Sequence, residues 1–369
     1  MTEHFTLLRG CALFENRRAR TPHSYILGTT NNVAAVTSAF ERTALTQLAA
    51  GVDPLSQASA PIRAELEIFL QSLAHTGMLN RNPQELRAPV RNNNEIAHRD
   101  ASFNLLRVRS APELLQAEWS DGKSDGGTST LAARSEFPIE LSGRSRVITL
   151  LYSILLASGV TRVRFADRHH KPLVTDSDIG FGGLEESDVG LSYYENAESR
   201  RRGISLFPTD RNFRYELDIS RPLAVIHYGD CDPEMLVHWS NQKMPHLVIH
   251  APIGDEIAVG PLVIPGQSPC IRCLSLYEID NFGFTRLERI DLTTIEELPA
   301  VTAHYIAAIA AAQILHFIDQ QSSKVDSPLP RNTGIGEVAY INFQKLTEPQ
   351  VVAIARHPLC GCDYELQCR

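Results

Sequence analysis

The sequence predicts an α/β protein with a mostly parallel sheet, preceded by a small, separate N-terminal module. From Phe137 onward, short apolar runs alternate with segments of helical period, which is the order of strand–helix–strand units. Residues 1–85 instead combine a hairpin pattern with short helical patterns. Between these parts, residues 120–130 read SDGKSDGGTST, a composition typical of a flexible linker. We therefore expect a module over residues 1–85, a connecting segment over 86–135 and an α/β domain over 136–369.

The N-terminal module is predicted to be winged-helix-like. Residues 11–28 hold two β-like runs on either side of a polar turn, the pattern of a hairpin. Residues 36–50 and 60–76 space their apolar side chains as one face of a helix. Gly77 follows the second of these segments directly, and a glycine at that place usually ends a helix. A hairpin next to short helices is typical of a winged helix.

The predicted α/β domain alternates buried strands and apolar helices. We expect helices over residues 145–158 and 302–318, each with an apolar face. The expected strands cover residues 137–141, 163–166, 223–227, 247–250 and 339–343. A strand, a helix and a second strand at this spacing indicate a parallel sheet.

Composition and charge exclude some classes of function. The 369 residues are 43% hydrophobic and carry a formal net charge of -8, which argues against a general nucleic-acid binder. The run Arg200–Arg201–Arg202 is interpreted as a solvated loop. No stretch approaches the ~18 apolar residues of a membrane span, and the first residues are too polar for a secretion signal. We therefore expect a cytoplasmic protein without membrane or nucleic-acid partners.

Two tight cysteine pairs predict a metal site. Cys270 and Cys273 form a CxxC pair, and Cys360 and Cys362 form a CxC pair. Close pairs supply two thiolates per loop, and four thiolates in a tetrahedron suit zinc. A closed four-thiolate site has no open position, so this zinc would be structural. Two alternatives are buried thiols clustered by chance and a redox dithiol at the first pair, and Cys368 is a substitute ligand.

A family resemblance rests on the segments around these cysteines. The string GPLVIPGQSPCIRCL, followed about 90 residues later by HPLCGC, resembles the ThiF/E1-like adenylating family. It looks most like the branch that serves thiazole/oxazole-modified peptide (TOMM) biosynthesis as the leader-peptide-binding partner of a cyclodehydratase. The match covers residues 139–362. The resemblance implies a Rossmann-type, E1-like fold with structural zinc, a homodimer, and a leader-recognition role for the N-terminal module.

The same resemblance locates a nucleotide site. In the family, the first strand leads into a glycine-rich turn that binds ATP phosphates at a helix N-terminus. Here only Gly143 keeps its place, while Ser145, Arg146 and Ile148 stand where glycines are expected. Arg144 and Arg146 offer charge for an anion instead. The resemblance also implies two acidic residues, which are Asp167 for the ribose and Asp230, or its neighbour Asp232, for magnesium. The plain interpretation of these acids is a helix cap and a loop turn.

Two functions follow from these observations. The first is a non-catalytic scaffold: the N-terminal module binds a peptide as an added strand, and the E1-like domain presents it to a modifying enzyme such as a YcaO-type cyclodehydratase. The alternative is an ATP-dependent adenylyltransferase that activates a peptide or protein carboxylate or amide. In that case Arg144 and Arg146 would hold the phosphates, with Asp230 on magnesium and Asp167 on the ribose. A small-molecule binder of another kind is the remaining possibility.

Overall fold

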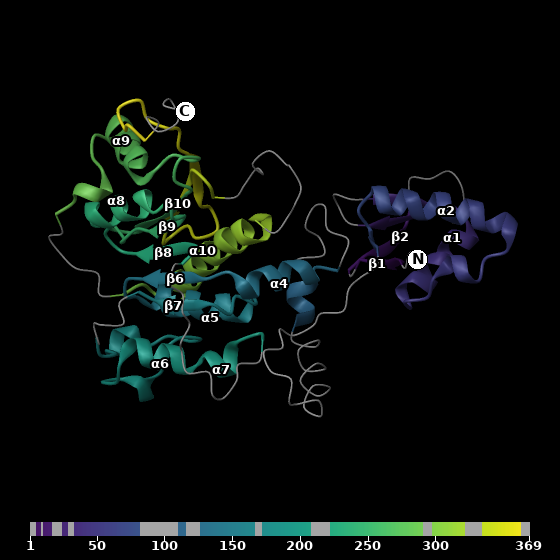
Figure 1. The fold of residues 1–369 in the computed structure, drawn as a ribbon, viewed down its shortest axis with the longest axis horizontal. Coiled ribbons are helices and arrows are strands. Elements are labelled where there is room, and N and C mark those ends of the chain that lie inside the picture. The colour runs from purple at the N-terminus through teal and green to yellow at the C-terminus, as the bar shows by residue number, and fades with distance from the viewer. Residues whose placement is uncertain are drawn as a thin grey trace. The chain divides into compact units, whose positions relative to one another are not determined.

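The computed structural model describes residues 5–8, 10–16, 24–28, 33–81, 110–115, 126–166, 172–207, 222–290, 297–321 and 334–362. The chain divides into two compact units, Met1–Ala132 and Ala133–Arg369 (Figure 1). Each unit has its own cluster of buried apolar side chains.

The first unit holds a small sheet and two helices. Strands β2 (Ala12–Glu15), β3 (Tyr25–Gly28) and β4 (Val33–Val36) form an antiparallel sheet in the order β2-β3-β4. Helix α1 (Ala39–Ala49), a short 3-10 helix (Pro54–Ser56) and helix α2 (Ala60–His75) follow. Strand β1 (Phe5–Leu7) pairs antiparallel with β5 (Leu79–Arg81).

The hairpin and the second helix of this unit are confirmed, whereas the first helix is shorter than predicted. β2 pairs antiparallel with β3, and the polar turn between them lies outside the described residues. Val36 belongs to β4, not to a helix. The reason is a capping box: the Ser38 side chain accepts from the Glu41 N–H, and the Glu41 carboxylate accepts from the Ser38 N–H. This pair fixes the start of α1 at Ala39 and leaves the preceding residues free to pair with β3.

The second unit is built on a seven-stranded mixed sheet in the order β12-β11-β10-β9-β8-β6-β7. Strands β7, β6, β8 and β9 run parallel, and β10, β11 and β12 extend the sheet antiparallel. The strands are β6 (Ile139–Ser142), β7 (Val163–Phe165), β8 (Ala224–Tyr228), β9 (His246–Ile249), β10 (Glu256–Val263), β11 (Glu337–Asn342) and β12 (Gln350–Ala353).

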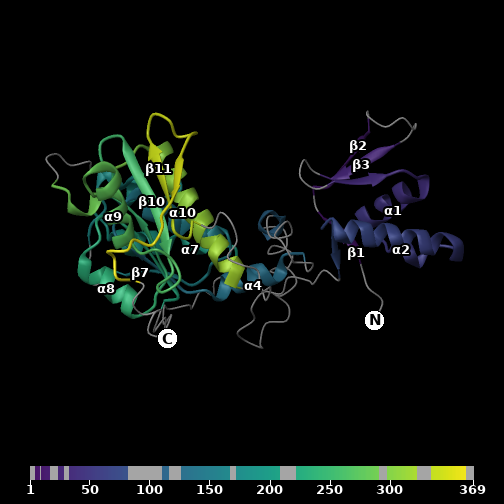
Figure 2. The same cartoon turned by 90° about the horizontal axis from the view of Figure 1, so that it is seen from above.

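Helices cover both faces of this sheet, and Figure 2 shows β10 with α9 on one side and α10 on the other. Helices α5 (Arg146–Ala157) and α10 (Ala300–Gln321) pack on one face with the largest apolar cluster. Helices α8 (Pro233–Asn241) and α9 (Ile271–Phe282) pack on the other face. The remaining helices are α4 (Thr128–Glu136), α6 (Tyr193–Ser199) and α7 (Arg201–Ile204), with 3-10 turns at Asp176–Asp178, Glu186–Asp188 and Arg286–Glu288.

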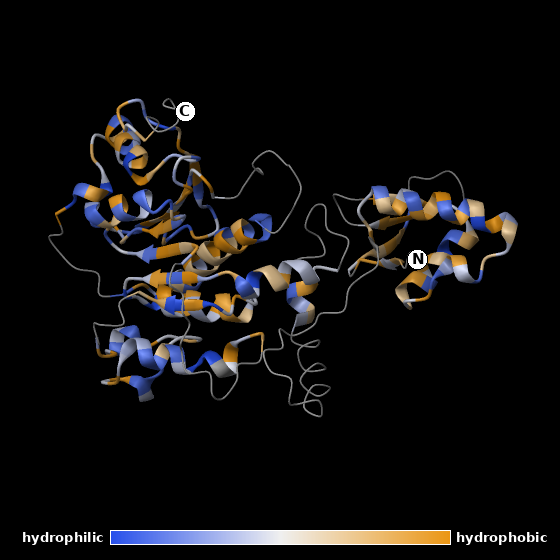
Figure 3. Cartoon of the chain, viewed as in Figure 1, coloured by the Kyte–Doolittle hydropathy of each residue, from blue (hydrophilic) through white to orange (hydrophobic). Residues whose placement is uncertain are grey.

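The predicted strands and helices of the α/β domain are confirmed to within a few residues. In Figure 3 the central strands, α5 and α10 are largely hydrophobic, which is why their sequence patterns were readable. The strands β10 and β12 and the helices α8 and α9 were not predicted. The run of residues 200–202 was expected to be a solvated loop. Arg201 instead begins α7 and is 4% exposed.

Helix α10 bears on the expectation that no segment spans a membrane. Among the described residues it is the one helix long and apolar enough to do so by length and composition, and 56% of its most apolar window is buried inside the protein. Its buried side chains pack against α5 and the sheet. A core helix of a globular protein has these same properties.

Candidate functional site

The four predicted ligand cysteines come from two distant parts of the second unit. Cys270 is the N-cap of α9, and Cys273 lies in the first turn of that helix. Cys360 and Cys362 lie in the turn that follows β12, where Gly361 adopts φ +76°. A residue with a Cβ rarely adopts this backbone conformation, so the glycine allows the chain to bring both flanking sulfurs inward.

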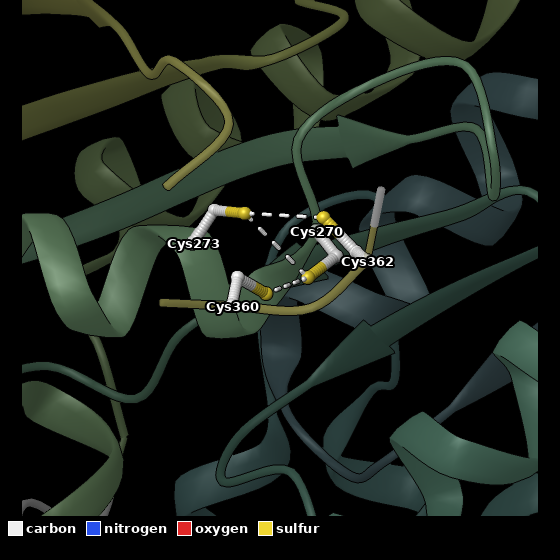
Figure 4. A group of neighbouring side chains, drawn as sticks. All are labelled: Cys270, Cys273, Cys360 and Cys362. Atoms are coloured by element: carbon white, nitrogen blue, oxygen red, sulfur yellow. Dashed lines mark hydrogen bonds between the residues drawn. The ribbon is translucent and has the colours of Figure 1, made fainter. Parts of the chain in front are cut away.

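The four sulfurs point toward one another (Figure 4) and all lie within 4.8 Å. The Cys270 sulfur is 3.8 Å from that of Cys273 and 3.3 Å from that of Cys360, and the Cys273 and Cys362 sulfurs are 3.5 Å apart. Zinc–sulfur bonds of ~2.3 Å in a tetrahedron put neighbouring sulfurs about 3.8 Å apart. The donor set and its spacing therefore fit a metal such as zinc. Cys368 lies outside the described residues.

His357 connects the two pairs of cysteines through hydrogen bonds. The His357 backbone N–H points at the Cys273 sulfur over 3.4 Å, and the Cys360 N–H donates to the His357 carbonyl over 2.9 Å. The His357 ring lies 2.9 Å from the Asp280 carboxylate of α9. The hydrogen bond from the Cys270 thiol lowers the pKa of Cys273.

The predicted phosphate turn connects β6 to α5. Gly143 adopts φ +91°, and a Cβ there would overlap the carbonyl oxygen of Tyr228. The turn therefore lies directly against the end of β8, and only glycine fits. Ser145 is the N-cap of α5, since its hydroxyl accepts from the Val147 N–H over 3.0 Å. Ile148, which stands where the family has a glycine, is completely buried.

A carboxylate from elsewhere in the chain lies on this helix N-terminus. One oxygen of Glu297 accepts from the Arg146 N–H over 2.8 Å, and the other accepts from the Ser145 hydroxyl over 3.0 Å and the Leu298 N–H over 2.9 Å. Burial raises the pKa of Glu297, while these hydrogen bonds oppose the rise. The carboxylate thus holds the backbone donor with which a helix start binds an anion.

The turn is also fixed by Tyr193 of α6. Its hydroxyl donates to the Ser145 carbonyl over 2.8 Å and accepts from the Ser145 N–H over 3.2 Å. Burial raises the pKa of Tyr193 above its usual range, so the phenol stays neutral and both bonds persist. Ser145 therefore has its N–H, carbonyl and hydroxyl all engaged within the chain.

The two arginines proposed as anion ligands are turned to other partners. Arg144 forms an ion pair with Asp178, with its Nε 3.3 Å from Oδ1, and donates to the Leu173 carbonyl over 3.1 Å. Burial alone would raise the pKa of Asp178, but hydrogen bonds from Arg144 and Thr175 outweigh it and leave that pKa lowered. The Arg146 side chain donates to the Leu298 carbonyl over 3.1 Å. Each guanidinium therefore donates to a group of the chain outside the turn.

The two predicted acidic residues that the structure describes, Asp230 and Asp232, have other partners. Asp230 is exposed and forms a 3.2 Å ion pair with Arg289, whose other nitrogen donates to the carbonyls of Ala251 and Pro252. Asp232 caps α8 by accepting from the Glu234 N–H over 2.8 Å, which is the plain structural role. Asp167 lies outside the described residues.

The sequence did not point to Glu297, Tyr193 or His227. Glu297 lies 151 residues from its partner Arg146, and Tyr193 lies 48 residues from Ser145. His227 contacts the Ser142 hydroxyl over 3.1 Å at the adjacent ends of β8 and β6. The one usable signal is that parallel strands end at a common edge, which brings the residues after β6 and β8 together.

Comparison with solved structures finds proteins of the same fold. A crystal structure of E. coli MccB with MccA-N7isoASN superposes with a TM-score of 0.61 at 15% identity, covering 98% of this chain and 99% of that one. MccB with ATP gives a TM-score of 0.58 at 16% identity over 98% of this chain and 99% of that one. A structure of PaaA gives 0.61 at 14% identity, covering 94% and 99%. No protein-family model and no curated protein matches the sequence. The chain has the E1-like (ThiF) fold, with four cysteines able to hold a metal such as zinc.

Proposed function

We propose that this chain is a peptide-binding protein whose E1-like unit presents a peptide to a separate modifying enzyme without adenylating it. One observation carries the proposal: the donors of the phosphate turn are already bound within the chain. The Arg146 N–H and the Ser145 hydroxyl donate hydrogen bonds to Glu297, and Arg144 forms an ion pair with Asp178. An ATP phosphate at this helix start would have to displace a carboxylate that accepts three hydrogen bonds.

The comparisons support the peptide part of the proposal. MccB was solved with MccA, and its similarity to this chain extends over 98% of the residues, including the N-terminal unit. We extend peptide binding from that protein to this chain.

The partner enzyme that we propose is of the YcaO cyclodehydratase type. We also propose that the chain forms a homodimer and that it is located in the cytoplasm.

The N-terminal unit offers an edge for such a peptide. We propose a winged-helix-like role in which the peptide adds as a strand beside β2. β2 is an edge of its sheet, and all four of its residues are exposed, including Leu13 and Phe14. A groove of about 590 Å³ lies beside it, between the sheet and α1, and includes Leu7, Leu27 and Arg42 in its lining. Main-chain hydrogen bonds would give affinity, and the groove would select side chains.

The metal would have a structural role in this account. Four cysteine sulfurs close the coordination sphere and leave no position for water or substrate. We propose that the ion is zinc and that it ties the start of α9 to the turn after β12.

The alternative function is an ATP-dependent adenylyltransferase. The similarity to MccB, which was solved with ATP, favours it. In that case Glu297 would leave the turn before ATP enters, and Arg144 would exchange Asp178 for phosphate.

The experiment that tests the proposal is calorimetric titration of zinc-loaded wild-type protein with magnesium–ATP. We expect no heat of binding at millimolar ATP. A second arm restores glycines with Ser145→Gly and Ile148→Gly, and we expect no binding there either because Glu297 still accepts from Arg146. Micromolar binding by the wild type would replace the proposal with the adenylyltransferase.

A further inference from the structure

We infer that Glu297 is an autoinhibitory group: its carboxylate occupies the anion position of α5 and keeps polyanions away from this helix. The inference rests on the proposed function and identifies the side chain that is responsible for it. It predicts that the backbone of the turn has kept its ability to bind an anion.

The geometry of the turn supports this inference first. α5 is a 12-residue helix, and its first N–H, that of Arg146, donates to the Glu297 carboxylate. Gly143 still lies against the Tyr228 carbonyl, and Ser145 is still held by the Tyr193 hydroxyl. The frame of the turn therefore stays in place, and the carboxylate is a separate group that comes to it from the residues before α10.

The position of Glu297 supports it next. The residue directly precedes Leu298, whose side chain is 1% exposed within the main apolar cluster and whose N–H donates to the same carboxylate. The Arg146 guanidinium donates to the Leu298 carbonyl. Arg146 therefore binds Glu297 through its backbone N–H and Leu298 through its guanidinium. These two contacts fix the carboxylate on the turn.

Charge supplies the third argument. A helix N-terminus favours a negative group, and one carboxylate satisfies that preference. A second anion would meet both an occupied donor and a like charge at the same place. In addition, Arg144 is paired with Asp178, and the positive charge of Arg146 already acts on the Glu297 carboxylate, so neither arginine is unpaired for a second anion.

The test uses inorganic pyrophosphate as the probe and the full-length, zinc-loaded chain. Glu297→Ala removes the occupying carboxylate, and Glu297→Gln keeps its shape and one acceptor but removes its charge. We expect the Ala variant to bind pyrophosphate at least tenfold more tightly than the wild type, with Gln between them. Glu41→Gln is the matched control, because Glu41 also accepts backbone N–H groups at a helix start but belongs to α1. This control is expected to bind as the wild type does.

The outcomes separate the inference from the proposed function. If folded Ala and Gln variants, as judged by thermal melting, bind pyrophosphate no better than the wild type, the autoinhibitory role of Glu297 is wrong while the scaffold proposal stands. If Ala does not fold, the Gln variant decides alone, because it keeps an acceptor for the Arg146 N–H. Tight pyrophosphate binding by the wild type would overturn the inference, and binding of magnesium–ATP by the wild type would overturn the scaffold.

Discussion

At the scale of single residues, one carboxylate occupies the N-terminus of α5. Glu297 accepts three hydrogen bonds there, while Tyr193 fixes the backbone of Ser145 on the other side. The loss of glycines at Ser145 and Ile148 is therefore only part of the change. The turn has a satisfied set of partners of its own, and the proposed function attributes the exclusion of ATP to these partners.

A second residue, His250, makes the free energy of unfolding depend on pH. It follows β9, is 3% exposed, and its Nε2 lies 3.0 Å from the Gly260 carbonyl, so the neutral ring donates there. Burial, aided by the charge of Arg286, lowers its pKa to about 3. Below the unfolded-state pKa of ~6.5, the unfolded chain binds a proton that the folded chain does not. The free energy of unfolding should therefore fall as the pH drops from about 6.5 toward about 3.

The measurement is urea unfolding at pH 7.5 and pH 5.5 for wild type and His250→Gln, which keeps a donor for Gly260. The loss of unfolding free energy between the two pH values should be smaller in the variant by about 1.4 kcal/mol. His238→Gln, at an exposed position on α8, is the matched control. Parallel pH profiles for wild type and His250→Gln would contradict the prediction.

At the scale of elements, the cysteine cluster connects α9 to the turn after β12. Cys270→Ser should release the metal, because three sulfurs no longer close the tetrahedron. Binding of structural zinc is coupled to folding, so we expect the free energy of unfolding to fall by several kcal/mol. Metal content by mass spectrometry and urea unfolding check both effects.

Cys231→Ser is the control for that prediction, since Cys231 lies outside the cluster in a half-buried position after β8. It should keep one metal ion per chain. A metal-free wild type, or a Cys270→Ser variant that melts as the wild type does, would show that the cluster is not a structural zinc site.

The elements that could be predicted are those whose signal is local. Strands β8 and β9 each contain three consecutive apolar residues, β6 alternates apolar Ile139 and Leu141 with polar residues, and α5 and α10 have apolar side chains on most of their turns. β10 was missed because Gly260 and Pro261 interrupt it, and a proline inside a run usually argues against a strand. β10 tolerates them where its register with β9 shifts, between Val259 and Leu262.

The candidate site was predictable only in part, for the same reason. The cysteine pairs could be found because two ligands lie within each short segment. Gly143 could be placed by the strand before it and the helix after it. Glu297 and Asp178 could not be assigned as partners of the turn, because their contacts with Arg146 and Arg144 span 151 and 34 residues.

At the scale of the whole molecule, the second unit holds both candidate sites in one sheet. The cysteine cluster packs with side chains of β10, β11 and α9, whereas the phosphate turn follows β6 near the parallel end of the sheet. Arg134 of α4 is fully buried and binds Asp319 of α10 with two nitrogens at 2.8 and 2.7 Å, which connects these two helices. The second unit thus combines the sheet and helices of an E1-like fold with a turn after β6 whose donors bind Glu297.

The measurement that tests this account most directly is amide hydrogen exchange at residues 143–150, with and without magnesium–ATP. In the wild type we expect slow exchange at the Arg146 amide, because Glu297 accepts its hydrogen bond, and no change when millimolar ATP is added. In Glu297→Ala the same amide should exchange faster. If ATP slows exchange across this segment in the wild type, the turn binds nucleotide and the account of an occupied, non-catalytic E1-like unit is wrong.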